Sequence, residues 1–494
     1  MKIRTAADLM GAHAAALSAE LFDKEIVGFS IDSRTTGAGE LFFALSQEDY
    51  ARAGFNGSFV DGHRFIRQAF SCGAIAAVAR TDHVLGNAEL QQLSGKLLLV
   101  DDAIAALQRL AHKVYAAWGR PVIGITGSAG KTTAKELTAH LLRASRRRVL
   151  KSERNYNNGL GLPLAVLQMV TEGRSPDQFD LAVLEMGMSS PTHEIERLCK
   201  ITPPDIAVEL LVAPVHLEHL GTLENIAAAK AELIEGLKPD GTAILNADDS
   251  FVMAMRAKHK GRTLTFGIES VADVTATGIE TRTLGRSRFR LVTPLGQAET
   301  ELPMPGRHNL MNALAASAVA TCFEIGPEEI ARALTSVTPA RMRGEVIDFA
   351  AGFTVVDDSY NSNPRSLLGM VQTLAEGGGQ ARRRIVVAGE MLELGDDAPR
   401  MHYESGERMA QAGIDLLLGV RGLASEIVDG ARKAGMSRDA ARYFKTSEEA
   451  AAALVDEVQE GDLILVKGSR GVETDKVVSL LKERFPIVGA DEVE

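Results

Sequence analysis

The sequence predicts an α/β protein with mainly parallel sheets and three domains. Apolar runs alternate with helical patterns over most of the chain, which is the arrangement of α/β domains. A length of 494 residues corresponds to roughly three domains, and a hydrophobic content of 45% suffices for separate packed cores. We place the domains at residues 1–117, 118–340 and 341–494.

The first predicted domain has strands at residues 39–45 and 73–79 around a helix at 63–70. A second helix, at residues 103–118, ends where "GRP" (residues 119–121) breaks the helical pattern before the next strand. The first domain boundary therefore lies near Trp118.

The second predicted domain begins with a strand, a glycine loop and a helix, and continues with further buried strands. In the region of residues 263–305 the pattern changes to short alternating segments, which predict a small antiparallel sheet appended to the parallel one. The predicted elements are strands at 121–126, 180–187 and 204–212 and helices at 131–143 and 308–326.

The third predicted domain is a second doubly wound, Rossmann-like unit, because its strands are again separated by helical stretches. Its strands are "FTVVDDS" (353–359), "RRIVVAG" (383–389), "DLLLGV" (415–420) and "DLILVKG" (462–468).

Composition excludes several classes of protein. A net charge of -11 gives no basic footprint for nucleic acid, and the basic run at residues 143–149 is simply the solvated end of a helix. The chain shows neither a signal-peptide pattern at its start nor an apolar run long enough to cross a membrane. Three widely spaced cysteines, Cys72, Cys199 and Cys322, favour neither a disulfide framework nor a zinc site, so we expect a reducing compartment, the cytoplasm.

The glycine loop "GITGSAGKTTAKE" (residues 124–136) resembles a phosphate-binding loop with one glycine missing. The general pattern G-x-x-x-x-G-K-[ST] requires glycine at position 125, which is isoleucine. The loop nevertheless lies between a predicted strand and a helix, so its amides and the helix N-terminus would cradle phosphates. Lys131 would reach the β and γ oxygens and Thr132 would hold Mg²⁺. The alternative is an ordinary strand-to-helix turn.

Two further side chains are predicted at the same edge of the sheet. Glu185 ends the buried strand "LAVLEMG", where open α/β folds bind ligands, and His216 follows the next strand. Their convergence favours metal binding. Taken alone, Glu185 could be a helix cap or a surface charge, and a lone histidine is more often structural.

Lys230 stands on an apolar stripe. In the helix at residues 224–237 it aligns with Ile226, Leu233, Ile234 and Leu237 at helical spacing. It could carry its charge to water along its stem. Otherwise desolvation lowers its pKa and leaves a neutral amine that can pair, attack, or take up CO₂ to become a carbamate.

Together these features resemble the Mur ligase family, the ATP-dependent amide-forming enzymes of peptidoglycan precursor synthesis. Its loop, T-G-[ST]-x-G-K-[ST], is matched by residues 126–132, so the missing glycine is what the family has. The resemblance covers nearly the whole chain and implies a UDP-sugar domain, an ATP domain and a C-terminal ligase domain. It rests on "DSR" (32–34), "NYNNGLGLP" (155–163), "EMGMS" (185–189), "HLEHLGTLENIAAAKAEL" (216–233), "GRHNLMNALAA" (306–316), "DDSYNSNPRS" (357–366), "GEMLELG" (389–395) and "LVKGSRG" (465–471).

The resemblance also implies roles for single residues. Glu185 would bridge two Mg²⁺ ions, Thr132 would hold the first and His216 the second, while Lys230 would be the family's carbamylated lysine and Lys131 would serve ATP. The implied ATP-binding residues are Thr126, Gly127, Ser128, Ala129, Gly130, Lys131, Thr132 and Thr133, with Asn309 and Asn312 at the adenine and Arg343 and Asp358 from the third domain. The implied substrate-binding residues are Ser33 and Arg34 near the uridine, and Asn157, Asn158, Tyr360 and Asn361.

The implied reaction activates a carboxylate. The terminal carboxylate of UDP-N-acetylmuramoyl-tripeptide attacks the γ-phosphate of ATP, and the amine of D-alanyl-D-alanine then displaces phosphate from the acyl phosphate. The enzyme is expected to be a monomer. Three positions depart from the family pattern: Leu211 replaces a common asparagine, Ser152 replaces a usual threonine, and residues 46–59 are longer than the usual connection.

Three other interpretations remain. One is the ligase that adds the third residue to the same precursor. Its D-N-P-R motif is similar to "SNPRS" (362–366), although in this chain that stretch directly follows "DDSYN". Another is a folylpolyglutamate synthetase-like ligase, which shares the ATP site. The last is an ATP-binding protein that has lost the reaction, against which the joint presence of Lys131, Glu185, His216 and Lys230 speaks.

Overall fold

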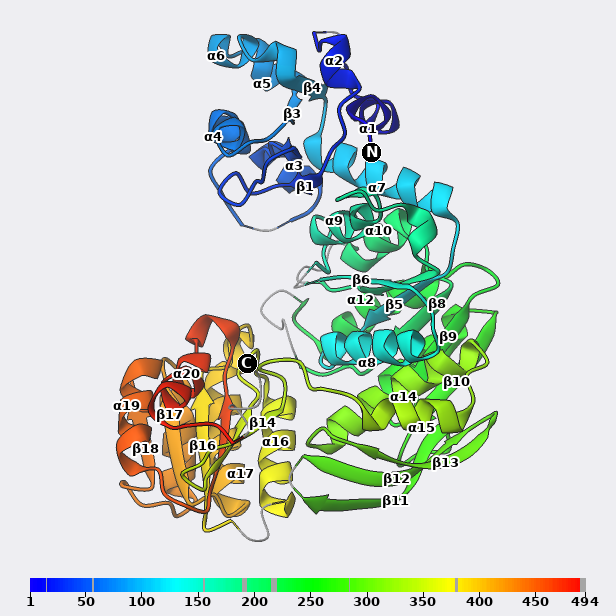
Figure 1. The fold of residues 1–494 in the computed structure, drawn as a ribbon. Helices are drawn as coiled ribbons and strands as arrows, with labels where there is room; N and C mark the ends of the chain where they lie inside the picture. The colour runs from blue at the N-terminus through cyan, green and yellow to red at the C-terminus, as the bar shows by residue number, and fades with distance from the viewer. Residues whose placement is uncertain are drawn as a thin grey trace.

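A computed structural model describes residues 1–14, 16–55, 57–153, 156–188, 193–214, 220–283, 285–377 and 381–488. Three sheets follow one another along the chain, which confirms the predicted three-domain α/β fold with mainly parallel strands. In Figure 1 the N-terminal section is blue, the central section runs from cyan to green, and the C-terminal section runs from yellow to red. None of the described helices combines the length and the apolar character of a membrane span.

The N-terminal section is a four-stranded, fully parallel sheet in the order β1-β2-β3-β4. Helix α7 leads from it into the central section. Asp102 caps the start of α7 by accepting a hydrogen bond from the Ala105 N–H, and Gly119 ends it with a left-handed φ of 65°. The elements are α1 (Ile3–Met10), α2 (Ala19–Phe22), β1 (Gly28–Ser30), β2 (Glu40–Phe43), α3 (Gln47–Arg52), η1 (Gly62–Phe65), α4 (Ile66–Ser71), β3 (Ala76–Arg80), α5 (Thr81–Leu85), α6 (Ala88–Gln91), η2 (Ser94–Lys96), β4 (Leu97–Val100) and α7 (Ala103–Trp118).

The central section is one nine-stranded sheet in the order β13-β12-β11-β10-β9-β8-β5-β7-β6. The seven strands from β11 across the sheet to β6 are parallel to one another. Strands β12 and β13 extend the β11 edge as antiparallel strands. The predicted antiparallel strands are therefore present and continue the parallel sheet at one edge. The strands are β5 (Val122–Thr126), β6 (Val149–Lys151), β7 (Leu181–Glu185), β8 (Ile206–Glu209), β9 (Thr242–Asn246), β10 (Arg262–Gly267), β11 (Val274–Thr283), β12 (Arg286–Thr293) and β13 (Gly296–Leu302).

Helices cover both faces of this sheet and bury alternate strand residues. One face packs on α8, α14 and α15, and the other packs on α7, α10 and α12. The core on the α7 face continues without a break into the core of the N-terminal sheet, since Ile3 and Phe43 belong to it together with Leu233. The helices are α8 (Lys131–Ala144), α9 (Gly161–Leu167), η3 (Gln168–Val170), η4 (Pro176–Gln178), α10 (Glu194–Ile201), α12 (Leu223–Glu235), α13 (Ser250–Ala254), η5 (Met255–Lys258), α14 (Arg307–Cys322) and α15 (Pro327–Thr335).

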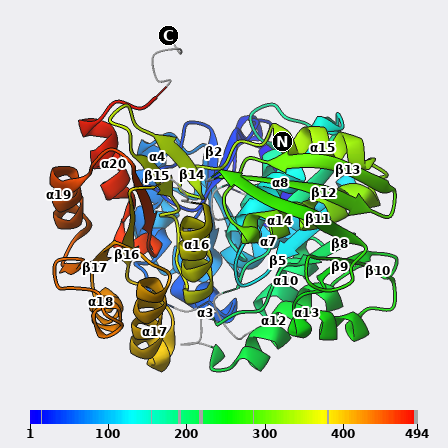
Figure 2. The same ribbon diagram turned by 90° about the horizontal axis from the view of Figure 1, so that it is seen from below.

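The C-terminal section is a six-stranded sheet in the order β14-β15-β19-β16-β17-β18, parallel except for β14, with its own core on each face. Helix α16 lies against α14 and β11 of the central section, as the view in Figure 2 shows. The elements are β14 (Glu345–Asp348), β15 (Thr354–Asp357), α16 (Pro364–Gly377), β16 (Arg383–Gly389), η6 (Gly395–Asp397), α17 (Ala398–Gln411), β17 (Leu416–Val420), α18 (Ala424–Lys433), β18 (Ala441–Phe444), α19 (Ser447–Glu457), β19 (Asp462–Lys467), η7 (Arg470–Val472) and α20 (Asp475–Arg484).

Candidate active site

The glycine loop joins β5 to α8 in a shape that needs glycine at two places. Gly127 has φ 151° and Gly130 has φ 84°, and a Cβ atom at Gly130 would overlap the Asn312 side chain. Ile125, at the position of the missing glycine, is a fully buried residue of β5. Position 125 therefore packs in the core of the sheet, and the loop that needs glycine begins two residues later.

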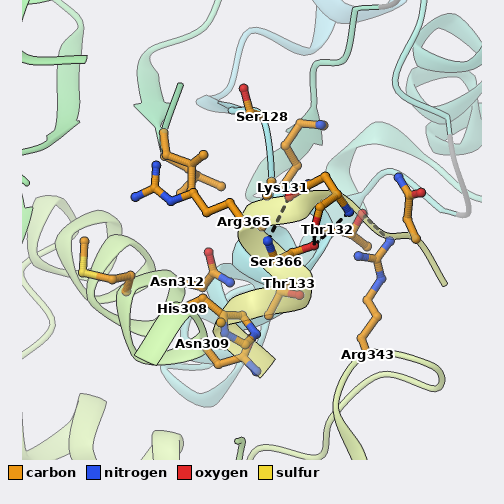
Figure 3. A pocket seen from close by; sticks show the side chains of 18 of the residues that line it. Ser128, Lys131, Thr132, Thr133, His308, Asn309, Asn312, Arg343, Arg365 and Ser366 are labelled. Atoms are coloured by element: carbon orange, nitrogen blue, oxygen red, sulfur yellow. Dashed lines mark hydrogen bonds between the residues drawn. The ribbon is translucent and has the colours of Figure 1, made fainter. Parts of the chain in front are cut away.

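A cavity of about 790 Å³ opens over this loop. Its walls come from the glycine loop, from the start of α14 and from the C-terminal section, and Figure 3 shows these side chains converging. Most of the residues predicted for the nucleotide line it: Ser128, Ala129, Gly130, Lys131, Thr132, Thr133, Asn309, Asn312, Arg343 and Asp358. Thr126 and Gly127 are not among the lining residues; the Thr126 hydroxyl is buried in the strand end and has no partner in the part of the chain that the structure describes.

Lys131 extends along the loop from the first turn of α8. Its ammonium group donates to the Gly127 carbonyl oxygen at 2.9 Å. Burial lowers the pKa of Lys131, the negative charge of Glu185 opposes this shift, and Arg343 adds to it. The loop therefore carries a partly buried basic group at the place where a phosphate chain would lie.

Thr132 and Glu185 form the centre of the site. The Thr132 hydroxyl donates to Glu185 Oε2 at 2.7 Å, and the Asn157 amide donates to Glu185 Oε1 at 2.9 Å. Arg343 reaches Thr132 Oγ1 at 3.1 Å from the C-terminal section. The Ser152 hydroxyl accepts a hydrogen bond from the Glu185 backbone N–H, so this departure from the family pattern keeps a hydroxyl on the strand end. A hydroxyl and a carboxylate so close together are the oxygen donors that Mg²⁺ prefers, so these two residues fit the ion.

Lys230 lies on α12 and is only 2% exposed. Its burial excludes the alternative in which the side chain carries its charge to water. Desolvation and the charge of Lys131 lower the pKa of Lys230 to about 7, although the charge of Glu209 partly opposes the shift. His216, the predicted partner of Lys230 at the second metal ion, lies outside the described residues.

Glu209, at the end of β8, is a buried residue of the site that we did not predict. Neither of its carboxylate oxygens has a hydrogen-bond partner among the residues the structure describes. It pairs in register with Thr126, so its side chain points to the face covered by α12, where Lys230 lies. Burial raises the pKa of Glu209 well above its usual range, and the charges of Lys230 and Lys131 oppose this. An acidic residue closing an apolar strand was the available signal, the same one that indicated Glu185.

The start of α14 forms a second wall of the cavity. Asn309 and Asn312 are both buried there, and the Asn309 amide donates to the Pro305 carbonyl oxygen at 2.7 Å. His308, which we did not predict, also lines the cavity; burial lowers its pKa, and Asp358 opposes this. Figure 3 shows the three side chains side by side below the glycine loop.

The C-terminal section contributes a charged wall. The Arg343 guanidinium stacks on the Tyr360 ring, 4.0 Å from its centre. Lys467, missed although "LVKGSRG" contains it, donates to Asp358 Oδ2 at 2.6 Å and to the Asn361 carbonyl oxygen at 2.9 Å. Tyr360 and Asn361 also line the cavity, together with Asp358, so they lie where a substrate in the cavity could contact them.

The remaining predicted substrate residues lie in two places. Asn157 and Asn158 line the cavity, and Asn158 Oδ1 accepts the backbone N–H groups that begin α9. Ser33 and Arg34 lie in the N-terminal section, away from the cavity. The Ser33 hydroxyl donates to the side chain of Gln68 at 3.2 Å, and Arg34 forms a two-point ion pair with Asp32 on the surface.

Among the described residues, a cluster of metal-ligand type also occurs in the N-terminal section, formed by Asp61, His63 and His83. His63 Nε2 accepts the Arg80 backbone N–H at 2.9 Å, and Nδ1 lies 2.7 Å from Asp61 Oδ1. The proton of the neutral ring must therefore sit on Nδ1 and point at Asp61. Since both nitrogens are occupied, this cluster is a hydrogen-bonded support of the sheet end.

Comparison with known proteins identifies the family. Residues 125–320 match the Mur ligase middle domain, and residues 342–470 match the Mur ligase, glutamate ligase domain. The UDP-N-acetylmuramoyl-tripeptide–D-alanyl-D-alanine ligase of Bacillus subtilis (strain 168) is 34% identical over 459 residues, 93% of each chain. The chain belongs to the Mur ligase family.

Solved structures of other Mur ligases share the whole fold. A crystal structure of MurF from Acinetobacter baumannii has a TM-score of 0.81 at 29% identity and covers 98% of both chains. MurF ligase from Thermotoga maritima, solved in complex with ADP, has a TM-score of 0.77 at 28% identity, covering 92% of this chain and 97% of its own. The similarity thus extends over all three sections of this Mur ligase, including the N-terminal one.

Proposed function

We propose that this Mur ligase uses ATP to join D-alanyl-D-alanine to UDP-N-acetylmuramoyl-tripeptide and forms the pentapeptide precursor of peptidoglycan. The observation that carries the proposal is the convergence of Lys131, Thr132 and Glu185 with Arg343 of the C-terminal section in one cavity. The similarity to MurF proteins over nearly the full length selects this member of the family over the ligase that adds the third residue.

The phosphates of ATP would lie on the glycine loop, where the backbone N–H groups and the N-terminus of α8 favour negative charge. The Lys131 ammonium would leave the Gly127 carbonyl for a phosphate oxygen. Asn309 and Asn312, deep in the wall formed by α14, would contact the adenine. Arg343 would neutralise phosphate charge from the opposite side, as an arginine does when a second domain closes on a nucleotide.

Thr132 and Glu185 would hold Mg²⁺, which when bound stabilises the charge on the transferring phosphoryl group. No side chain of the protein needs to form a covalent bond to the substrate. The tripeptide carboxylate attacks the γ-phosphorus and releases ADP, and the amine of D-alanyl-D-alanine then attacks the acyl carbon and releases phosphate. Contacts between the C-terminal and central sections would keep water away from the acyl phosphate. This matters because water would otherwise hydrolyse that intermediate.

Lys230 would act as a carbamate. Burial lowers the pKa of Lys230 to about 7, so about half of this lysine is a neutral amine at pH 7, and a neutral amine adds CO₂. The new carboxylate would provide oxygen atoms for a second Mg²⁺ together with Glu185, with His216 as the expected further ligand. This changes a buried cation into an anion, which suits a position beside metal ions.

We further expect a monomer in the cytoplasm. The three cysteines are unpaired, which agrees with a reducing compartment. Sedimentation of the purified protein over a range of concentrations would test the oligomeric state.

The decisive test is ADP release with UDP-N-acetylmuramoyl-tripeptide and each candidate acceptor in turn. We expect release with D-alanyl-D-alanine and none with single amino acids or with folate and glutamate. Lys131→Ala is the matched control, because it removes charge from the phosphates without removing core packing; it should fold and fail to turn over ATP. Acceptor-independent ADP release, or release at the wild-type rate from Lys131→Ala, would contradict the proposal.

A further inference from the structure

The described residues of the connection that is longer than the family pattern, 46–55 and 57–59, are anchored in the N-terminal section by several hydrogen bonds. Asp49 in α3 is fully buried and accepts hydrogen bonds from the Arg80 guanidinium at 2.7 Å and from the Ala103 N–H at 2.9 Å. The Gln47 side chain closes the segment, since it donates to the Gly57 carbonyl oxygen and accepts the Phe59 N–H, each at 3.1 Å. Hydrogen bonds therefore hold the described parts of this segment near both of its ends.

An aromatic cluster fixes Phe55 within this segment. The Tyr50 ring lies 4.8 Å from the Phe55 ring and 5.0 Å from the Phe59 ring, measured between ring centres. Tyr50 and Phe55 are partly buried against the core that the N-terminal and central sections share. Phe59 is 39% exposed and lies on the outer side of Tyr50.

Phe55 touches the central section at a glycine. A Cβ atom placed on Gly159 would lie only 2.8 Å from Phe55 Cζ, so the ring approaches as closely as it does because position 159 has no side chain. The Gln108 amide of α7 lies close to the same place and donates to the Gly159 carbonyl oxygen at 2.8 Å. Gly159 is thus fixed by the contact with an aromatic ring and by a hydrogen bond to its carbonyl oxygen.

The loop held at Gly159 also holds Glu185. Two residues before the glycine, the Asn157 side chain donates to Glu185 Oε1, and the Asn157 carbonyl oxygen accepts the Gly187 N–H at 2.7 Å. One of the two hydrogen bonds that orient the Glu185 carboxylate therefore depends on where this short loop lies. Groups that orient a metal ligand commonly change metal affinity by 10-fold to 100-fold when removed, as an order of magnitude.

We propose that Phe55 is a positioning residue for Glu185: its ring fixes the loop at Gly159, and the loop holds the carboxylate through Asn157. The inference rests on the proposed function in one respect, the role of Glu185 in holding Mg²⁺. It connects the N-terminal section, where the UDP end of the precursor is expected, with the metal site of the central section. The ring acts through packing, so its effect depends on its shape.

Three variants at position 55 test this. Phe55→Ala removes the contact, and Phe55→Leu keeps an apolar group in part of the space. Phe55→Tyr keeps the ring but adds an oxygen to Cζ, the atom nearest Gly159, so it should displace the loop. We expect Phe55→Ala and Phe55→Tyr to raise the Mg²⁺ concentration for half-maximal turnover by about 3-fold to 10-fold, and Phe55→Leu to restore most of the wild-type value. Phe59→Ala, which changes the same cluster on its exposed side, is the matched control and should leave the value unchanged.

Binding of Mn²⁺ to the enzyme with ADP, followed by electron paramagnetic resonance, measures the same effect without turnover. It should weaken in parallel for Phe55→Ala and Asn157→Ala, and the double variant should be no weaker than Asn157→Ala alone, because both act through one contact. Unchanged Mn²⁺ affinity in folded Phe55→Ala and Phe55→Tyr, or additive effects in the double variant, would overturn the inference. If the wild type binds Mn²⁺ but shows no acceptor-dependent ADP release, the proposed function is wrong. The Mn²⁺ affinities of the Phe55 variants then still decide whether Phe55 positions Glu185.

Discussion

Two glutamates end the strands on either side of β5 in the central sheet, and their hydrogen bonding differs. Glu185 on β7 is level with Ile125 and faces α8, where both of its oxygens accept hydrogen bonds from uncharged donors. Glu209 on β8 is level with Thr126 and faces α12, where the described residues give its oxygens no hydrogen bond. A shift of one residue in register thus places two equally buried carboxylates on opposite faces of one sheet.

The difference shows how one fold supplies two kinds of acidic group. The hydroxyl and amide that hold Glu185 can rearrange when a cation takes the carboxylate, so this side suits metal binding. Glu209 instead lies on the same face as Lys230, both side chains are buried, and the charge of each shifts the pKa of the other. We therefore expect Glu185 to bind the metal ion directly and Glu209 to adjust the charge state of Lys230, which would bind only as a carbamate.

The largest expected effect separates the two glutamates directly. Glu185→Gln should lower kcat by about 10²-fold to 10³-fold, the size of one lost electrostatic contact at a transition state, and should abolish Mn²⁺ binding with ADP. Glu209→Gln puts a neutral group of similar shape where burial already disfavours the charged carboxylate, so kcat should change by less than about fivefold, ~1 kcal/mol of barrier. Equal losses in the two variants, measured at saturating substrates, would remove the distinction between the two faces.

A second prediction concerns the lysine on the α12 side. Lys230→Ala should lose most activity, roughly 10²-fold, and regain part of it when a short carboxylic acid fills the vacated space and replaces the carbamate. Lys230→Arg should remain inactive, since a guanidinium stays protonated and cannot take up CO₂. Turnover is compared with and without added acid, with Lys131→Ala as a control that the acid should not rescue. Full activity in Lys230→Arg would exclude the carbamate.

A third prediction uses the pH dependence of stability. Lys230 has a pKa of about 7 in the folded protein and 10.5 ordinarily, so between these values the unfolded chain binds more protons than the folded one. Stability should therefore rise with pH from 7 to 10.5. Glu209→Gln in bicarbonate-free buffer isolates this effect from the paired carboxyl group, and Tm should increase by several degrees over that range. In Glu209→Gln/Lys230→Met the rise should be smaller; identical profiles would show that Lys230 is not the titrating group.

The smallest expected effect lies at the contact between sections. Arg343 donates to Thr132 on the α8 side and stacks on Tyr360. Arg343→Lys keeps the charge and loses the planar contact, so KM for ATP should rise about threefold to tenfold, ~1 kcal/mol, with kcat nearly unchanged. Small-angle scattering with nucleotide and precursor should show less compaction than for the wild type. An unchanged KM would mean that Arg343 contributes to closure only.

The sequence predicts those parts of the site that lie on regular elements. The strand, loop and helix around Lys131 and the helical stripe that buries Lys230 are local patterns, and the structure reproduces both. Glu209 escaped notice although it ends an apolar strand as Glu185 does, because no motif drew attention to it. Phe55 and Gly159 lie more than one hundred positions apart in the sequence, and a local sequence pattern cannot show that two such residues touch. The short strands β14 and β18 were also missed, since they lie at the two edges of their sheet and are only partly apolar.

The unbroken core between the N-terminal and central sections limits how this chain can be taken apart. A gene fragment ending at residue 117 would leave the apolar side of α7 without α9 and α10, so the isolated N-terminal piece should be poorly soluble. Residues 341–494 have two cores of their own and are the better candidate for expression as a separate fragment. Exchange of parts between related ligases should therefore succeed at the second junction, where one acceptor-side module could replace another, and fail at the first.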